Sequence, residues 1–136
     1  LEMGMAESVL SGIKKGLPQH LSTVYEKVVI ELLWKHMDRF FPYTAVGRWW
    51  EKNEEIDIVA VNPDLNSIVF GEVKWSEKPV GTDVYTALKE KARKVVWGKK
   101  NRKEFFCLFS RKGFTDTMLK TASKEGVILF KGETIL

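Results

Sequence analysis

The clearest pattern of hydrophobic and polar positions lies in residues 54–76, where two β-branched and aromatic runs flank the turn sequence Asn62-Pro63-Asp64. This arrangement predicts two strands joined by a tight turn. Side chains alternate between the faces of a strand, so Glu72 and Lys74 share one face of the second strand, while Asp57 interrupts the apolar first strand. Charged groups on apolar strands are costly to bury without a partner or a metal ion, so we expect these residues to have a function.

A second pattern, with apolar residues at three- and four-residue steps, predicts a helix from Pro18 to Arg39. Glu26 lies at the shoulder of its apolar stripe, where it can face the core. A structural alternative remains open, because Thr23 and Glu26 have the spacing of a capping box.

The remaining elements alternate. We expect a strand in residues 41–50, forming a hairpin with the Asp57 strand, and a helix after Pro79-Val80-Gly81, capped by Thr82 or Asp83 and ended by Gly98. Further predicted elements are a strand at 104–110, a helix at 114–125 closed by Gly126, and a strand at 127–130. Helices that alternate with strands imply parallel pairing, and the whole order predicts an α/β sandwich with a sheet covered by helices.

The length of 136 residues suits a single domain, expected at 18–136, after a linker or flexible leader at 1–17. The chain opens on Leu1 rather than Met, so it can be a piece of a longer protein, a point that the sequence leaves open. No apolar run approaches the roughly 20 residues of a membrane span, and we expect no membrane partner. The single cysteine, Cys107, lies in an apolar run and is predicted to be a buried reduced thiol in a cytoplasmic protein.

Basic residues are unevenly distributed: residues 89–103 hold eight Lys or Arg against one Glu. Such a segment can face phosphate, although a solvated helix face is the simpler explanation. Arg48 and Lys52 lie near the first hairpin turn, as phosphate contacts or as ordinary edge charges. Trp49, Trp50 and Trp75 can stack on bases, but we expect at least two of them in the core. The predicted nucleic-acid-binding residues are Arg48, Lys52, Lys94, Lys99, Lys100, Arg102 and Lys103.

The acidic residues Glu26, Asp57 and Glu72 supply oxygen ligands of the kind that Mg²⁺ prefers. Asp57 and Glu72 lie on adjacent predicted strands, and the helix that carries Glu26 packs across the sheet. Lys74 lies one pleat repeat beyond Glu72, about 6–7 Å along the strand, where its ammonium can hold a water or steady a phosphate. These parts predict metal-dependent hydrolysis of a phosphodiester, with Mg²⁺ or Mn²⁺ as the cofactor.

The same residues carry a family resemblance. Asp57 followed by Glu72-Val73-Lys74, with Glu26 on a preceding helix, resembles the signature of the PD-(D/E)XK nuclease superfamily. The segment GRWWEKNEEIDIVA followed by FGEVKWS resembles the nuclease-like C-terminal domain of archaeal P-loop ATPases and, more distantly, archaeal Holliday junction resolvases. The sequence departs from the superfamily signature at Ile56, where the name implies proline.

The resemblance implies a restriction-endonuclease-like αβββαβ core, with a central mixed sheet flanked by helices. It implies metal binding by Asp57, Glu72 and, less securely, Glu26, and catalysis by these residues with Lys74. DNA is the implied substrate, and an ATPase module is an implied partner, although no Walker A loop occurs in this chain. A homodimer is common among similar nucleases, and the sequence leaves the oligomeric state open.

Three alternatives remain. The charges can form a structural ion-pair network, although buried ion pairs are poor stabilisers. The domain can also keep a nuclease fold while only binding nucleic acid or regulating an attached ATPase, because fold does not dictate function. An assembly domain with an aromatic docking surface is the third alternative.

Overall fold

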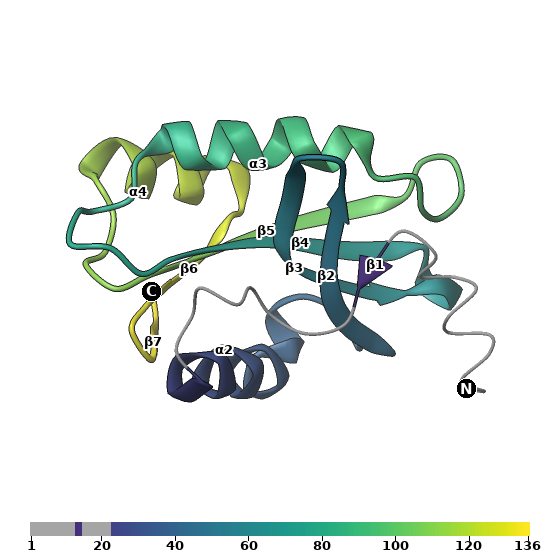
Figure 1. The fold of residues 1–136 in the computed structure, drawn as a ribbon, viewed down its shortest axis with the longest axis horizontal. Coiled ribbons are helices and arrows are strands. Elements are labelled where there is room, and N and C mark those ends of the chain that lie inside the picture. Colours follow the sequence, from purple (N-terminus) through teal and green to yellow (C-terminus); the bar gives the residue numbers. More distant parts are fainter. Residues whose placement is uncertain (1–12, 15–22) are drawn as a thin grey trace.

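The computed structural model describes residues 13–14 and 23–136, which form a mixed seven-stranded sheet with helices on both faces (Figure 1). The strands are β1 (Ile13–Lys14), β2 (Ala45–Glu51), β3 (Glu54–Asn62), β4 (Ser67–Lys74), β5 (Lys103–Ser110), β6 (Ile128–Lys131) and β7 (Thr134–Ile135). The helices are α2 (Thr23–Lys35), α3 (Thr82–Lys94) and α4 (Asp116–Glu125), with short 3₁₀ turns at η1 (Met37–Arg39) and η2 (Pro63–Leu65).

The strands are arranged in chain order, from β1 to β7. β2, β3 and β4 pair antiparallel. β4, β5 and β6 pair parallel, and the helices α3 and α4 connect these three strands along the chain. The predicted α/β class and αβββαβ order are therefore confirmed, with α2, β2, β3, β4, α3 and β5 as the core. The short edge strands β1 and β7 were not predicted. The expected leader, residues 1–17, lies outside the described residues apart from Ile13–Lys14, which pair with β2.

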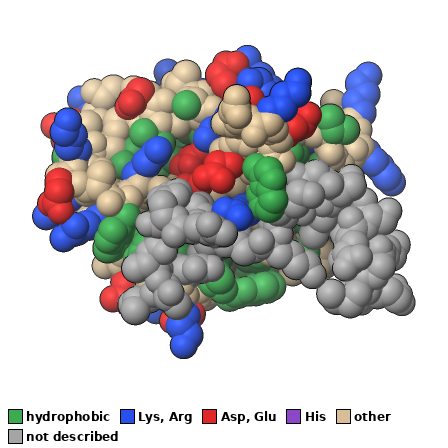
Figure 2. Space-filling view, in the orientation of Figure 1, with side chains coloured by type: hydrophobic (Ala, Val, Ile, Leu, Met, Phe, Trp, Pro, Cys, Tyr) green, Lys and Arg blue, Asp and Glu red, His purple; other side chains and the backbone are tan. Residues whose placement is uncertain are grey.

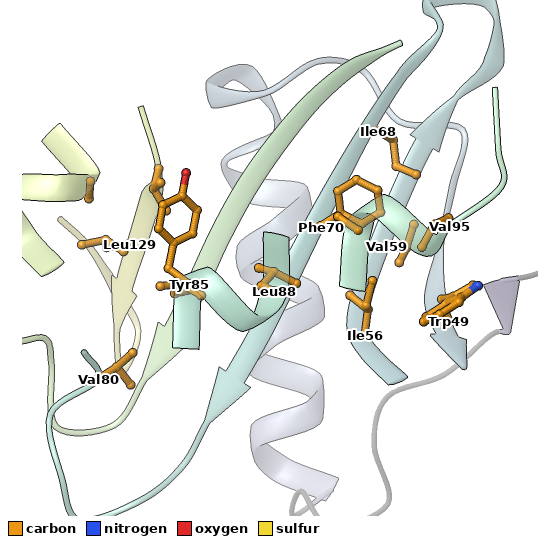
Figure 3. Packing of buried hydrophobic residues seen from close by; sticks show 14 of the residues in the cluster. Trp49, Ile56, Val59, Ile68, Phe70, Val80, Tyr85, Leu88, Val95 and Leu129 are labelled. Carbon is orange, nitrogen blue, oxygen red and sulfur yellow. The ribbon is translucent and has the colours of Figure 1, made fainter. Parts of the chain in front are cut away.

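The sheet separates two hydrophobic cores. α2 covers one face, and α3 and α4 cover the other (Figure 1). The α3 side contains Val59, Phe70 and Leu88 (Figure 3), whereas the α2 side contains residues of opposite parity on the same strands, such as Ile58 and Val69. This alternation follows from the two-residue period of a strand, and it places each apolar side chain in one core or the other.

Several predicted boundaries shift. The first strand begins at Ala45 rather than Phe41, and the described part of the first helix ends at Lys35 rather than Arg39. Helix α3 begins at Thr82, but its N-cap is Gly81, with no side-chain cap.

The predicted end of α3 at Gly98 is wrong, because the helix stops at Lys94. Arg102 explains this early end. Its guanidinium donates hydrogen bonds to the carbonyls of Ala92, Val95 and Trp97 at 2.8–3.0 Å, so side-chain donors satisfy the last turn. Helix α4 ends as predicted, with Gly126 in the left-handed conformation at φ +75°.

The tryptophan prediction is also wrong. Trp49 is buried at 2% exposure, but Trp50 and Trp75 remain 39% and 43% exposed. Trp49 points into the α3 core (Figure 3), whereas Trp50 is the next-to-last residue of β2 and Trp75 follows the last residue of β4. None of the described helices is both long enough and apolar enough to cross a membrane.

Candidate functional site

The candidate site lies where β3 and β4 separate. The two strands pair from Asn62 and Ser67 as far as Ile58 and Gly71. One more step of this register would place Asp57 opposite Glu72, but the ladder stops there. Instead, Asp57 Oδ2 accepts a hydrogen bond from the backbone N–H of Val73 at 2.8 Å. The Asp57 side chain thus satisfies a donor of β4 that the ended ladder leaves unpaired.

Asp57 and Glu72 are both buried, each with only 4% of its surface exposed. The pKa of Glu72 is raised from 4.5 to about 8, chiefly because its side chain is buried and then because the Asp57 carboxyl lies beside it. The ammonium of Lys91 acts in the opposite direction on the same pKa. Two neighbouring carboxyls in a poorly solvated place favour a shared proton or a bound cation.

Lys91 is the site residue that the sequence analysis missed. It extends from α3, and its Nζ forms an ion pair with Glu72 Oε1 and donates a hydrogen bond to the carbonyl oxygen of Glu55 at 2.8 Å. A signal was present, since Lys91 lies three residues after Leu88 and four before Val95, both buried. A lysine within the apolar stripe of a helix either extends its ammonium to solvent or pairs with a buried acceptor.

These groups line a cleft of about 440 Å³. Lys74 and Trp75, at the exposed end of β4, also line it, so the structure brings Asp57, Glu72 and Lys74 together. None of the ion pairs between described residues involves Lys74, which leaves its ammonium available to an incoming anion. Figure 2 shows acidic side chains gathered near the centre of one face of the molecule, with basic side chains around them.

Glu26 lies in the first turns of α2, but its side chain is outside the described part of the structure. Its neighbour Tyr25 contacts Trp75, with ring centroids 3.7 Å apart. This contact places the start of α2 against the residue that follows Lys74. Among the described residues, no group of three acidic, histidine or cysteine side chains is arranged to hold a metal ion.

The predicted basic contacts separate into two groups. Lys99, Lys100 and Lys103 are exposed in and after the loop that precedes β5. Lys103 pairs in register with Ser67 at the start of β4, whereas Glu72 is five residues further along, about 17 Å at the usual rise of a strand. These three lysines therefore lie away from the cleft.

Three of the other four predicted contacts, Arg48, Lys94 and Arg102, have partners within the domain. Arg102 is committed to the end of α3 and to Glu104, at 2.9 Å. The guanidinium of Arg48 lies 4.5 Å from the ring centroid of Trp50 and 3.8 Å from Glu55. Lys94 pairs with Glu54 at 2.7 Å, and Lys52 is exposed at the tip of the β2–β3 hairpin. Whether any of the seven residues contacts nucleic acid stays a prediction.

Residues 1–96 match the model of the family DUF234, described as "Archaea bacterial proteins of unknown function". The chain belongs to this family. The description of the DUF234 family assigns no activity to its members.

Relatives of this DUF234 domain include an uncharacterised protein of Methanocaldococcus jannaschii, MJECL04, which is 40% identical over 68 residues. That match covers 48% of this chain but only 16% of the relative. Among solved structures, a repair endonuclease from Pyrococcus abyssi is 17% identical, with a TM-score of 0.47 over 84% of this chain and 48% of the other. A protein of unknown function, AF1548, is 24% identical, with a TM-score of 0.42 over 74% and 53%. The chain thus spans about half the length of both structures, and the likeness is one of fold alone.

Proposed function

We propose that this domain hydrolyses phosphodiester bonds in DNA as a divalent-metal-dependent endonuclease. The observation that carries the proposal is the buried pair of carboxyls, Asp57 and Glu72, in a cleft that also exposes Lys74. A buried acid with a raised pKa, such as Glu72, is a candidate functional group, and the cleft gives a substrate access to it.

The chemistry of the donors fits Mg²⁺ or Mn²⁺. Asp57 and Glu72 would hold the ion, and Glu26 is proposed as a further ligand from α2. Two carboxylates suffice for Mg²⁺, which keeps several waters and takes the rest of its shell from substrate oxygens. The hydrogen bond from Val73 uses one oxygen of Asp57 and fixes the orientation of its carboxylate. When bound, such an ion lowers the pKa of a coordinated water and neutralises charge on the phosphate.

The protein residues would act by charge and position. Lys74 is exposed in the cleft, where its ammonium can bind a phosphate oxygen and stabilise the negative charge that builds up there during hydrolysis. Asp57 is held by the backbone of β4, and Glu72 and Lys74 belong to β4 itself, so all three are carried by the sheet rather than by loops. A rigid scaffold of this kind maintains the alignment that catalysis requires.

Four wider assignments belong to the same proposal. They are membership of the PD-(D/E)XK superfamily, attachment to an ATPase module in a longer protein, dimer formation and a cytoplasmic location. The order of the elements and the spacing of Asp57, Glu72 and Lys74 support the first. The small fraction of MJECL04 that the chain covers is compatible with the second.

A nicking assay on supercoiled plasmid and on branched DNA tests the activity, with Mg²⁺, Mn²⁺ or EDTA. We expect cleavage with either ion, none in EDTA, and strongly reduced cleavage from Asp57→Asn and Lys74→Met. Lys120→Met, an exposed change on α4, is the control and should cleave as the unmodified protein does. Cleavage that persists in EDTA, or that survives both site substitutions, would refute the assignment.

The ion pair between Lys91 and Glu72 favours a second candidate, a non-catalytic domain that binds nucleic acid or regulates an attached ATPase. In that case Lys91 is a permanent structural partner of Glu72, and no metal enters. DNA binding would then depend on salt, through Lys99, Lys100 and Lys103, but not on Mg²⁺ or on Asp57.

A further inference from the structure

Lys91 joins the two strands at the point where they separate. Its Nζ contacts Glu72 on β4 through an ion pair, and it donates a hydrogen bond to the carbonyl of Glu55 on β3. The ammonium therefore lies at the place where the carboxyls of the cleft meet. Both contacts come from one flexible side chain on the covering helix.

A positive charge in this position has a specific consequence. Glu72 is buried beside Asp57, and an ammonium or a metal ion can each offset the cost of its negative charge. An ammonium and a divalent cation repel each other, and both bind carboxylate oxygens. The two cations therefore compete for Glu72.

We propose that the Lys91 ammonium is an internal counter-ion that occupies the ionised carboxylate of Glu72 in the metal-free protein and must leave it before a divalent ion binds. This inference rests on the proposed metal-dependent function. It makes Lys91 a residue that sets metal affinity, because each binding event includes the cost of breaking its two contacts. In this respect Lys91 acts through Glu72 and is not a catalytic residue.

The surroundings of Lys91 allow such an exchange. Leu88 and Ala92, its neighbours on α3, are buried at 0% and 1% exposure, so the helix itself is fixed on the sheet. The side chain of Lys91 is 23% exposed and lines the cleft. Its four-carbon stem can thus move the ammonium toward solvent without moving the helix.

Mn²⁺ binding to the full chain, measured by calorimetry and by electron paramagnetic resonance, tests the proposal. Lys91→Met keeps the length of the side chain and removes its charge, and we expect it to bind Mn²⁺ about tenfold more tightly, within the usual range of coupling between two ligands. Lys89→Met is the matched control, since Lys89 lies on the same helix but pairs with Glu125 on α4. It should bind Mn²⁺ as the unmodified protein does.

An affinity that is unchanged or weaker in Lys91→Met would overturn the proposal, because the ammonium would then be neutral or helpful to the metal. If Lys91→Met does not fold, as judged by circular dichroism, Lys91→Gln is measured instead, against the same two outcomes. Asp57→Asn distinguishes a failure of the Lys91 role from a failure of the metal site. Mn²⁺ binding that Asp57→Asn abolishes but Lys91→Met does not tighten refutes only the role of Lys91. A lack of Mn²⁺ binding in every variant refutes both this role and the metal site.

Discussion

Asp57 accepts the backbone N–H of Val73 at 2.8 Å, and this one contact connects the fold to the site. It lies at the first position where β3 and β4 no longer pair, and it joins the carboxyl of one strand to the residue after Glu72 on the other. The Asp57 side chain therefore lies where the β3–β4 ladder stops, lines the cleft, and has its own carboxylate oriented by the backbone of β4.

The first prediction concerns that hydrogen bond. Asp57→Ala leaves a buried N–H without an acceptor, so we expect the free energy of unfolding to fall by about 1–3 kcal/mol. Asp57→Asn keeps an acceptor and should lose less stability, although it removes the charge needed for a metal. Urea unfolding measures the difference. Asp64→Ala, an exposed change in η2, should stay within about 0.5 kcal/mol of the unmodified protein.

The second prediction is a pH dependence of stability in EDTA. The pKa of Glu72 is about 8 in the folded protein, above the ordinary 4.5 that the unfolded chain retains. Folded protein therefore holds this proton more tightly, and its stabilising contribution is complete below pH 4.5 and is lost as the pH rises to about 8. The expected slope approaches about 1.4 kcal/mol per pH unit within that window.

Glu72→Gln isolates this effect, because it removes the titrating group and keeps a hydrogen-bonding side chain. The free energy of unfolding of the variant should change less with pH between 4.5 and 8 than that of the unmodified protein. Equal slopes for the two proteins would show that Glu72 does not hold a proton in this range.

The sequence predicts most of the strands and the proximity of Asp57 and Glu72, and the reason is local. A two-residue period assigns each side chain to a face, and a short turn at residues 62–64 forces the two strands to be neighbours. Acids at matching distances from that turn then have to face each other. Little tertiary information is needed for this part of the site.

The partner of Lys91 and the position of the loop lysines, Lys99 and Lys100, could not be predicted from the sequence and became known only from the structure. Periodicity indicates the buried side of α3, but it does not say where along the strands the helix lies, so the partner of Lys91 could not be named. The position of Lys99 and Lys100 depends similarly on the direction of β4, whose first residue, not its last, adjoins the loop. The expectation that at least two of Trp49, Trp50 and Trp75 lie in the core rests on the usual burial of aromatic residues in strands, but Trp50 and Trp75 are exposed.

The third prediction concerns the exposed loop lysines. Replacing Lys99, Lys100 and Lys103 by Gln should weaken binding to a DNA duplex and reduce the slope of log affinity against log salt by roughly three, if each contacts one phosphate. Mn²⁺ binding should not change, because this loop is at the far end of β4 from Glu72. Fluorescence anisotropy across a salt series measures the slope.

A matched triple replacement distinguishes contact from net charge. Lys35, Lys120 and Lys124 are exposed on α2 and α4, and their replacement by Gln removes the same total charge. If both triple variants reduce the slope of log affinity against log salt equally, the effect is one of net charge, and the loop lysines do not contact the DNA.

The fourth prediction tests the packing beneath Glu72. A Cβ at Gly71 would lie 2.7 Å from Cys107 Sγ and 3.2 Å from Ile58 Cβ, closer than packed atoms allow. Gly71→Ala should therefore cost about 1–3 kcal/mol of stability through overpacking. Adding Cys107→Ala removes the nearest atom, so the double variant should be more stable than the sum of the two single changes predicts. Strict additivity in urea unfolding would show that the contact with Cys107 is not what excludes a side chain here.

The last prediction separates catalysis from binding at Lys74. Its side chain is exposed, and none of the described ion pairs involves it, so Lys74→Met should leave the free energy of unfolding within about 0.5 kcal/mol. If the ammonium stabilises charge on the phosphate mainly in the transition state, the cleavage rate should fall about 10²–10³-fold. Mn²⁺ affinity should not fall, because the variant keeps both buried carboxyls and removes only a nearby positive charge. Single-turnover cleavage with saturating Mn²⁺ gives the rate. A variant that loses Mn²⁺ binding together with cleavage would assign Lys74 to the support of the acidic pair, whereas unchanged cleavage would remove it from the reaction.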